Sequence, residues 1–261
     1  MKRLGACALL LTASVAFAEE APDDRARLTA LLEKSLAAYA AVNDYRAVFL
    51  KQELQNGALG GRETIFLKFE KPFKIFLHWS DTSKKGLQVL YERGRHDGKL
   101  AIHQPGLLFG LAPVVFLEQS SPWVREGSES YDIEDAGIGT FLEDFAAMVE
   151  KGIQENRIRA RVTDSEEGAE VDVSFPGTSS GGDYFAGRVE AFFDAKTQLP
   201  VRMKLYDWQG NVTGIYAYTE LALNIGADDA EFRRLAHKRL QKLYLPQVKI
   251  TPRNNFSSRT N

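Results

Sequence analysis

The sequence predicts an α+β fold built on a large, curved antiparallel sheet with two helices. Hydrophobic residues recur at helical spacing near the start and the middle of the chain. Elsewhere they alternate with period two over short runs that are separated by turn residues, which is typical of an antiparallel meander. About ten strands in one sheet have to curl or close, and a wide sheet leaves room for a ligand or an inserted helix.

The composition is that of a globular protein. The 261 residues are 44% hydrophobic and 26% charged, which suffices for a sizeable core and excludes disordered, collagen-like and coiled-coil chains. Residues 19–232 contain 23 basic and 35 acidic residues, a net charge of −12. A body this acidic argues against nucleic-acid binding.

Residues 1–18 are expected to be a signal peptide. Two basic residues precede the apolar segment Leu4–Phe17, and Ala16-Phe17-Ala18 fits the small-x-small cleavage rule. Cleavage after Ala18 predicts a periplasmic protein that loses Cys7, its one cysteine, so no disulfide, thiol nucleophile or cysteine-bound metal is expected. Lipidation at Cys7 is the alternative, although Leu4-Gly5-Ala6-Cys7 precedes the apolar stretch instead of following it.

The elements follow in chain order. A helix is expected after Pro22, with Asn43-Asp44 as its stop, and a second helix over Ile138–Ile153. Strands are expected at Tyr45–Gln55, Arg62–Glu70, Phe73–Ser80, Leu87–Arg93, Lys99–His103, Arg157–Asp164, Ala169–Phe175, Gly187–Asp194, Val201–Trp208 and Val212–Asn224. Gly106–Phe116 is apolar and glycine-rich, and Ser120–Ser130 is expected to be a polar loop. One domain, 19–232, is predicted.

The third strand has two unlike faces. Phe73, Ile75, Leu77 and Trp79 share one side, whereas the other side is polar except at Phe76. The flanking strands repeat the apolar side through Ile65, Leu67 and Phe69, and through Leu87, Val89 and Tyr91. A filled core beneath a helix and an aromatic-lined cavity both fit this pattern.

Several segments resemble one known superfamily. They are Phe49-Leu50-Lys51-Gln52-Glu53, Gly57, the run from Lys71 to Trp79, Leu90-Tyr91-Glu92-Arg93-Gly94, Asp97-Gly98-Lys99-Leu100 and Ile133-Glu134-Asp135-Ala136-Gly137-Ile138-Gly139. In this order they resemble an uncharacterised periplasmic family within the LolA-like superfamily, that of the outer-membrane lipoprotein carrier. The likeness covers roughly residues 30–225. It implies an incomplete antiparallel barrel with helices as a lid over a cavity for acyl chains.

The resemblance implies a periplasmic carrier that binds a lipid or lipoprotein in a cavity. The expected cavity residues are Phe49, Leu67, Ile75, Leu77, Trp79, Val89 and Tyr91 from the sheet, with Phe141, Phe145 and Met148 from the second helix. Leu107, Leu108 and Phe109 are expected to form a lid. Lys71 stands where the carrier has an arginine that latches its lid, and lysine lacks the guanidinium fork.

The resemblance also implies the partners. They are an acyl-chain lipid or lipoprotein and a membrane-bound donor or acceptor, bound by a monomer. A different function, an envelope lipid sensor of the anti-sigma regulator type, stays open.

No cofactor is predicted and catalysis is not expected, with a serine hydrolase that uses Ser179 as the weaker alternative. Gly177-Thr178-Ser179-Ser180-Gly181 matches the nucleophile elbow of serine hydrolases in form, but a strand instead of a helix is expected after it. The four histidines have no partner at metal-ligand spacing. The acidic residues around Trp123, including Glu134 and Asp135, lack the spacing of a calcium loop and are expected to be solvated.

Residues 233–261 form a basic tail with eight Lys and Arg and no acidic residue. Phe232, Leu235, Ala236, Leu240 and Leu243 fall on one side of a predicted helix, and Arg233, Arg234, His237, Lys238, Gln241 and Lys242 on the other, before Pro246 ends it. The helix either packs on the sheet or docks the protein on anionic membrane.

Overall fold

The computed structural model describes residues 24–55, 57–105, 114–125, 132–177 and 184–226, without the side chains of Trp123 and Arg125. The predicted signal peptide, the lid residues Leu107, Leu108 and Phe109, Ser179 and the basic tail lie outside these residues.

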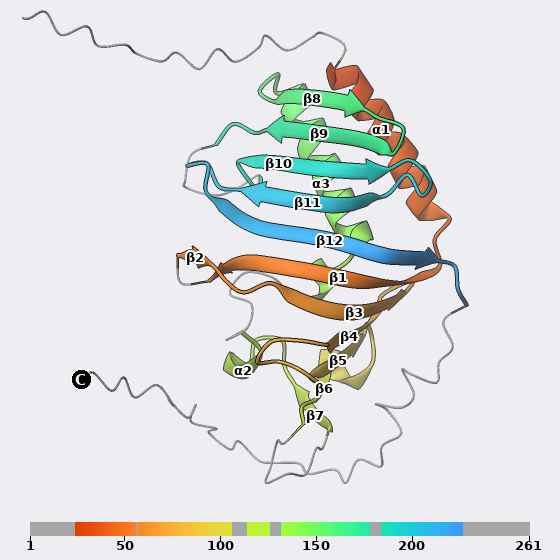
Figure 1. Cartoon of the computed structure of the whole chain (residues 1–261), viewed down its shortest axis with the longest axis vertical. Coiled ribbons are helices and arrows are strands. Elements are labelled where there is room, and N and C mark those ends of the chain that lie inside the picture. The colour runs from red at the N-terminus through yellow and green to blue at the C-terminus, as the bar shows by residue number, and fades with distance from the viewer. Residues whose placement is uncertain (1–23, 56, 106–113, 126–131, 178–183, 227–261) are drawn as a thin grey trace, which may run out of the picture. The chain divides into compact units, whose positions relative to one another are not determined.

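The described residues form an antiparallel sheet and two long helices, so the predicted α+β class is confirmed (Figure 1). The helices are α1 (Asp24–Ala40), α2 (Pro122–Arg125) and α3 (Ile138–Gln154), with 3-10 turns η1 (His96–Gly98) and η2 (Ile133–Asp135). The strands are β1 (Asp44–Gln55), β2 (Ala58–Leu59), β3 (Glu63–Glu70), β4 (Lys74–Trp79), β5 (Gln88–Glu92), β6 (Leu100–His103), β7 (Val114–Leu117), β8 (Arg159–Asp164), β9 (Gly168–Ser174), β10 (Arg188–Asp194), β11 (Pro200–Tyr206) and β12 (Val212–Leu223). The strand β7 and the helix α2 stand where no regular element was predicted.

By their contacts these residues fall into two compact units. Unit 1 contains residues 24–42, 50–62 and 135–219, and unit 2 contains 43–49, 63–134 and 220–226. In unit 1 the strand order is β1-β12-β11-β10-β9-β8, and in unit 2 it is β7-β6-β5-β4-β3-β1. The strands β1 and β12 therefore contribute to both units.

In unit 1 the helices cover one face of the sheet. Along β8, β9, β10 and β11 the buried side chains stand opposite one another, as in the row Val162, Val171, Ala191 and Met203. Helix α1 contacts β8 and α3, and α3 contacts β11 and crosses behind the strands in Figure 1. Period-two alternation on the strands therefore produces the core of this unit.

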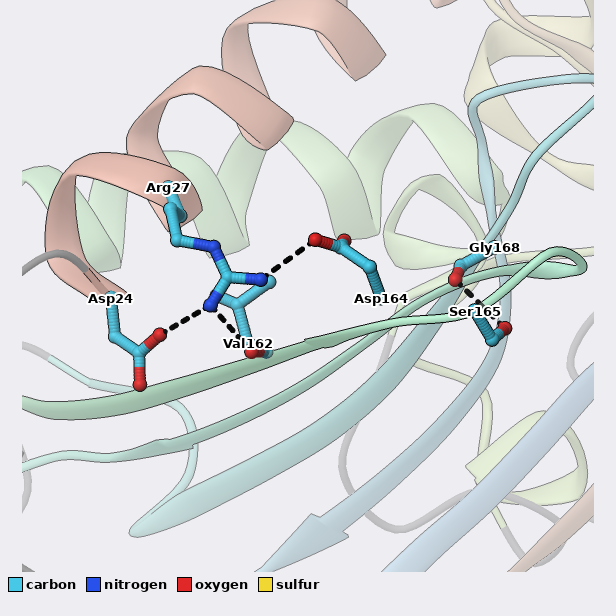
Figure 2. A network of polar contacts seen from close by, with 6 residues as sticks. All are labelled: Asp24, Arg27, Val162, Asp164, Ser165 and Gly168. Atoms are coloured by element: carbon cyan, nitrogen blue, oxygen red, sulfur yellow. Dashed lines mark hydrogen bonds and ion pairs between the residues drawn. The ribbon is translucent and has the colours of Figure 1, made fainter. Parts of the chain in front are cut away.

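Helix α1 also covers the outer edge of β8, the last strand of unit 1. Arg27 Nη1 donates hydrogen bonds to Asp24 Oδ1 at 2.8 Å and to the carbonyl oxygen of Val162 at 2.9 Å, and Nη2 donates to Asp164 Oδ2 at 2.7 Å (Figure 2). Arg25 Nη2 donates to the carbonyl oxygen of Ile158 at 2.7 Å. Two arginines thus bind carbonyls that an edge strand otherwise leaves open for another strand.

In unit 2 each face of the sheet carries buried apolar residues. Ile75, Phe76 and Leu77 are buried in succession on β4. Phe76 packs with Leu90, Ala101 and Val114, and the half-buried Phe66 and Phe116 lie against this cluster. Phe76 thus interrupts a side of β4 that also carries Lys74 and His78, and β5, β6 and β7 supply its apolar neighbours.

Candidate functional site

Unit 2 carries a continuous apolar surface on β3, β4 and β5, here called the apolar face. It consists of three cross-strand rows: Phe69, Ile75 and Tyr91; Leu67, Leu77 and Val89; and Ile65 with Trp79. Successive rows are two residues apart along each strand, so the side chains of all three rows point to the same side of the sheet. Six of the seven sheet residues that we predicted from the sequence stand in these rows, and Phe49 lies on β1.

The side chains of the apolar face are buried. Leu67 and Ile75 are 0% exposed, and Leu77 and Trp79 are 7% exposed. An acyl chain that binds here has to replace side chains that now pack against these residues. Their assignment to a cavity stays a prediction.

Aromatic rings continue the apolar face beyond its first row. The ring centroid of Phe69 lies 5.1 Å from that of Tyr45 and 5.3 Å from that of Phe73, and Phe73 lies 5.9 Å from Tyr91. These separations are typical of stacked and edge-to-face pairs. The sequence-based list of cavity residues contains none of these three rings. Phe69 and Phe73 were nevertheless placed on the apolar side of their strands by the sequence pattern.

At the Tyr91 end the apolar face is bounded by an anchored carboxylate. The Tyr91 hydroxyl donates a hydrogen bond to Glu134 Oε1, and Arg93 Nη2 donates to Glu134 Oε2 at 2.7 Å. Hydrogen bonds from Arg93 and Tyr91 hold the pKa of Glu134 below its usual value, while burial and Glu134 raise the pKa of Tyr91 to about 12. Glu134 is therefore no freely solvated loop residue, which corrects the sequence-based expectation.

At the opposite end a second carboxylate is held by Trp79. Trp79 Nε1 donates to Glu63 Oε2 at 2.8 Å, and Lys84 Nζ lies 2.5 Å from Glu63 Oε1. The ammonium of Lys84 also lies 5.9 Å from the centre of the Trp79 ring. Both oxygens of the buried Glu63 are thus satisfied, and the apolar face has a charged pair at each end.

The helical residues predicted for the site lie in unit 1, on α3. Phe141 and Phe145 stack at 5.5 Å, Phe145 meets Phe175 edge-to-face at 6.4 Å, and Met148 is buried. Each of these contacts is internal to unit 1. That these residues and the sheet residues line one cavity remains a prediction.

The start of α3 explains two glycines of the family-like segment Asp135–Gly139. Gly137, the N-cap of α3, has φ of +119°, a value that side chains disfavour. A Cβ on Gly139 would lie 2.1 Å from the Tyr39 ring of α1. Tyr218 of β12 is buried beside Tyr39 and makes a hydrogen bond with the backbone of Gly137, so these glycines permit close packing of α1, α3 and β12.

Lys71 takes part in a backbone contact of unit 2. Its amide donates to the carbonyl oxygen of Asn43 at 2.8 Å. The predicted role of its side chain as a lid latch is neither supported nor contradicted by this bond, and it stays a prediction.

The described part of the chain offers neither a metal site nor a membrane span. It contains no group of three His, Cys, Asp or Glu side chains that could hold a metal ion. No helix within it is long and apolar enough to cross a membrane.

A family model described as "Protein of unknown function (DUF1571)" matches residues 42–240. The chain belongs to this family. No curated protein matches it. The match includes β1 to β12, and so all residues of the apolar face.

The solved structures similar to this chain include members of the predicted superfamily. A domain from Vibrio parahaemolyticus described as outer membrane lipoprotein-sorting is 12% identical, with 78% of this chain and 98% of that chain covered and a TM-score of 0.38. A LolA superfamily protein from Nitrosomonas europaea is 9% identical, with 74% and 92% covered and a TM-score of 0.33.

A regulator complex is among the similar structures too. For the MucA/MucB complex of Pseudomonas aeruginosa the identity is 14%, the coverage 78% of this chain and 60% of that chain, and the TM-score 0.44.

Proposed function

We propose that this protein binds the acyl chain of a lipid or lipoprotein on the apolar face of unit 2 and carries it through the periplasm without catalysis. The observation that carries the proposal is the set of three apolar rows on β3, β4 and β5 with a charged pair at each end. At about 3.4 Å per residue the rows extend over roughly 14 Å, a length suited to an extended acyl chain.

The energetics of such a site need no polar recognition. Each methylene that leaves water contributes about 0.8 kcal/mol, so an acyl chain supplies ample binding free energy. Part of this binding free energy is offset, because the side chains that now cover Leu67 and Ile75 have to move aside. Binding is therefore coupled to a local opening, and hand-over to a membrane-bound acceptor follows from closure of the same surface.

The periplasmic location is part of the proposal. It is supported by the leader-like residues 1–18, with cleavage after Ala18. Fractionation of cells that express the full chain should place a protein shortened by 18 residues in the periplasm. A protein of full length in the cytoplasm contradicts the location and leaves the binding proposal to its own test.

The binding test is the substitution Leu77→Glu, in the middle row of the apolar face. We expect a folded protein that binds a fluorescent fatty acid at least tenfold more weakly, because a carboxylate disfavours the apolar ligand. Thr163→Glu, on an exposed position of β8, is the matched control and should bind as the wild type does.

Two outcomes speak against the acyl site. Unchanged affinity of Leu77→Glu means that the ligand does not contact the middle row. Global unfolding means that Leu77 belongs to a packed core, where an unpaired carboxylate costs several kcal/mol.

A further inference from the structure

Two side chains of β5 and its end bind a carboxylate at one end of the apolar face. Tyr91 and Arg93 are two residues apart, and the amide of Arg93 donates to the carbonyl oxygen of Phe73 at 2.9 Å, so the strand pairing continues as far as Arg93. Both side chains therefore point to the side of Val89, in line with the apolar rows. The Tyr91 hydroxyl donates to Glu134 Oε1, and Arg93 Nη2 donates to Glu134 Oε2 at 2.7 Å. These two donors are here called the Arg93 site.

The Arg93 site also covers a buried ring. The guanidinium of Arg93 lies 5.0 Å from the centre of the Phe73 ring, and Phe73 is 5% exposed. The side chains of Arg93 and Glu134 are themselves 52% and 34% exposed. At Phe73, one solvent-exposed side chain therefore lies between the aromatic end of the apolar face and water.

The charged pairs at the two ends of the apolar face differ in how easily they separate. The side chain of Glu63, at the other end, is 9% exposed and is bonded to Trp79 and Lys84. Separation of Glu63 from these partners leaves a buried charge without compensation, which is strongly unfavourable. Glu134 and Arg93 return to water when they separate, because both are partly exposed, and the cost is small. The apolar face therefore opens more readily at the Arg93 site.

The chemistry of the Arg93 site indicates which head group can replace Glu134. A guanidinium presents its N–H donors in a planar fork that matches the two oxygens of a carboxylate or phosphate. An amphiphile whose chain lies along the apolar rows brings its head to the end of those rows, where Arg93 stands. An anionic head can accept the bonds that Glu134 now accepts, whereas a neutral ester head leaves Arg93 without a counter-ion there.

We infer that Glu134 occupies, in the free protein, the place of the ligand's anionic head. On binding, a carboxylate or phosphate head displaces Glu134 from Tyr91 and Arg93, and the acyl chain enters the apolar face at this end. Glu134 thus keeps the site closed until an anionic amphiphile arrives. The inference rests on the proposed function, since it names the class of lipid whose chain the apolar face binds.

The test compares three lipids that carry the same oleoyl chain. Monooleoylglycerol has a neutral head, its phosphate monoester has a phosphate, and oleate, at a pH at which it is ionised, has a carboxylate. Each competes with a fluorescent fatty-acid probe bound to the full chain, below its critical micelle concentration. The measured quantity is the preference, defined as the affinity for an anionic lipid divided by the affinity for monooleoylglycerol.

Two variants should move the preference in opposite directions. Glu134→Gln removes the competing charge, so the preference for at least one anionic lipid should rise about threefold or more. Arg93→Gln removes the fork, so the same preference should fall about threefold or more. The lipid whose preference responds identifies the head as a carboxylate or a phosphate. An ion pair that only stabilises the fold would change the affinities for all three lipids alike and leave the preference unchanged.

Controls for these variants come from the same unit. Arg95→Gln and Glu118→Gln each remove the charge of a side chain that is 69% or 60% exposed, and both should leave the preference unchanged. Arg93→Lys keeps the charge without the fork, so its preference should lie between those of the wild type and Arg93→Gln. Urea unfolding checks that each variant is folded.

The outcomes separate this inference from the proposed function. Equal preferences in the wild type, Glu134→Gln and Arg93→Gln overturn the inference, while displacement of the probe by monooleoylglycerol still supports acyl binding. A preference that falls in Arg93→Gln but does not rise in Glu134→Gln also overturns it, because Glu134 then does not compete with the head. If neither the probe nor any of the lipids binds the wild type, the proposed function fails, and the inference with it.

Discussion

Glu134 joins residues that are far apart in the sequence. Its carboxylate accepts hydrogen bonds from Tyr91 and Arg93, 43 and 41 residues earlier, and so ties η2 to β5. The side chains of Arg93 and Glu134 are 52% and 34% exposed, so solvent screens much of their attraction. Glu134 contributes to local attachment more than to global stability.

The first prediction concerns the pH dependence of this attachment. Glu134 has a lowered pKa in the folded chain, so its stabilising effect is present above its ordinary value of 4.5 and is lost as the pH falls through the lowered value. Glu134→Gln should lower the free energy of unfolding by about 0.5–1 kcal/mol near neutral pH, and the difference should vanish in acid.

Urea unfolding at several pH values measures this difference. Glu118→Gln, at a carboxylate whose side chain is 60% exposed, is the control and should have little effect. A difference between wild type and Glu134→Gln that persists unchanged in acid would contradict the role of the charge.

The second prediction at this scale concerns Gly139. A Cβ there would lie 2.1 Å from the Tyr39 ring, so Gly139→Ala should destabilise the protein by about 1–3 kcal/mol through overpacking. Combination with Tyr39→Leu should recover part of the loss, which a double-mutant cycle in urea measures. Gly61→Ala, with no neighbouring atom within 4 Å, is the control. Additive losses would contradict direct contact.

At the scale of elements, α1 covers the outer edge of β8 and so keeps another strand from pairing with it. Arg25 and Arg27 lie on the first turn of α1 and bind carbonyl oxygens of Ile158 and Val162, which adjoin or belong to β8. Figure 2 shows the contacts of Arg27. The helix therefore holds the place that an added strand would otherwise take.

The third prediction follows from this cover. The double variant Arg25→Ala and Arg27→Ala should lower stability by about 1–2 kcal/mol and allow self-association through β8, because its carbonyls lose their donors. Hydrogen exchange in residues 158–164 and sedimentation at increasing concentration measure the two effects. Arg161→Ala on the same strand should change neither. A double variant that stays monomeric with unchanged exchange would show that the arginines do not guard the edge.

The longer elements could be predicted because their period extends over several residues. The alternation of Ile65, Leu67 and Phe69 and the helical stripe of α3 identified β3 and α3 correctly. The strand β7 and the helix α2 have four residues each, too few to establish a period. Such short elements depend on neighbours that the local sequence does not specify.

At the scale of the whole molecule, the apolar part of the candidate site could be predicted and its polar part could not. Leu67, Leu77 and Val89 share one row because each strand alternates independently of its neighbours. The hydrogen bond from Trp79 to Glu63 joins two neighbouring strands, and no spacing rule links these two positions. Polar partners across a sheet follow from register, which only the folded chain defines.

The fourth prediction concerns the basic tail, residues 233–261. If the tail docks on membrane, the full chain should sediment with anionic but not with neutral vesicles, since each basic residue near the surface contributes about 1 kcal/mol. Moderate salt should release it. A chain that ends at Gly226 should lose this association and still bind a fluorescent fatty acid. Absent or salt-insensitive vesicle binding by the full chain would contradict membrane docking.

The three consecutive buried residues of β4 limit the substitutions that members of this family can accept there. On β10, buried Val189, Ala191 and Phe193 alternate with half-buried positions, so every second residue can be replaced by a polar one. On β4, Ile75, Phe76 and Leu77 offer no such position, because one cluster lies on each side. Among members that diverge by single substitutions, β4 should therefore change slowly and only between apolar residues, while β10 drifts at alternate sites.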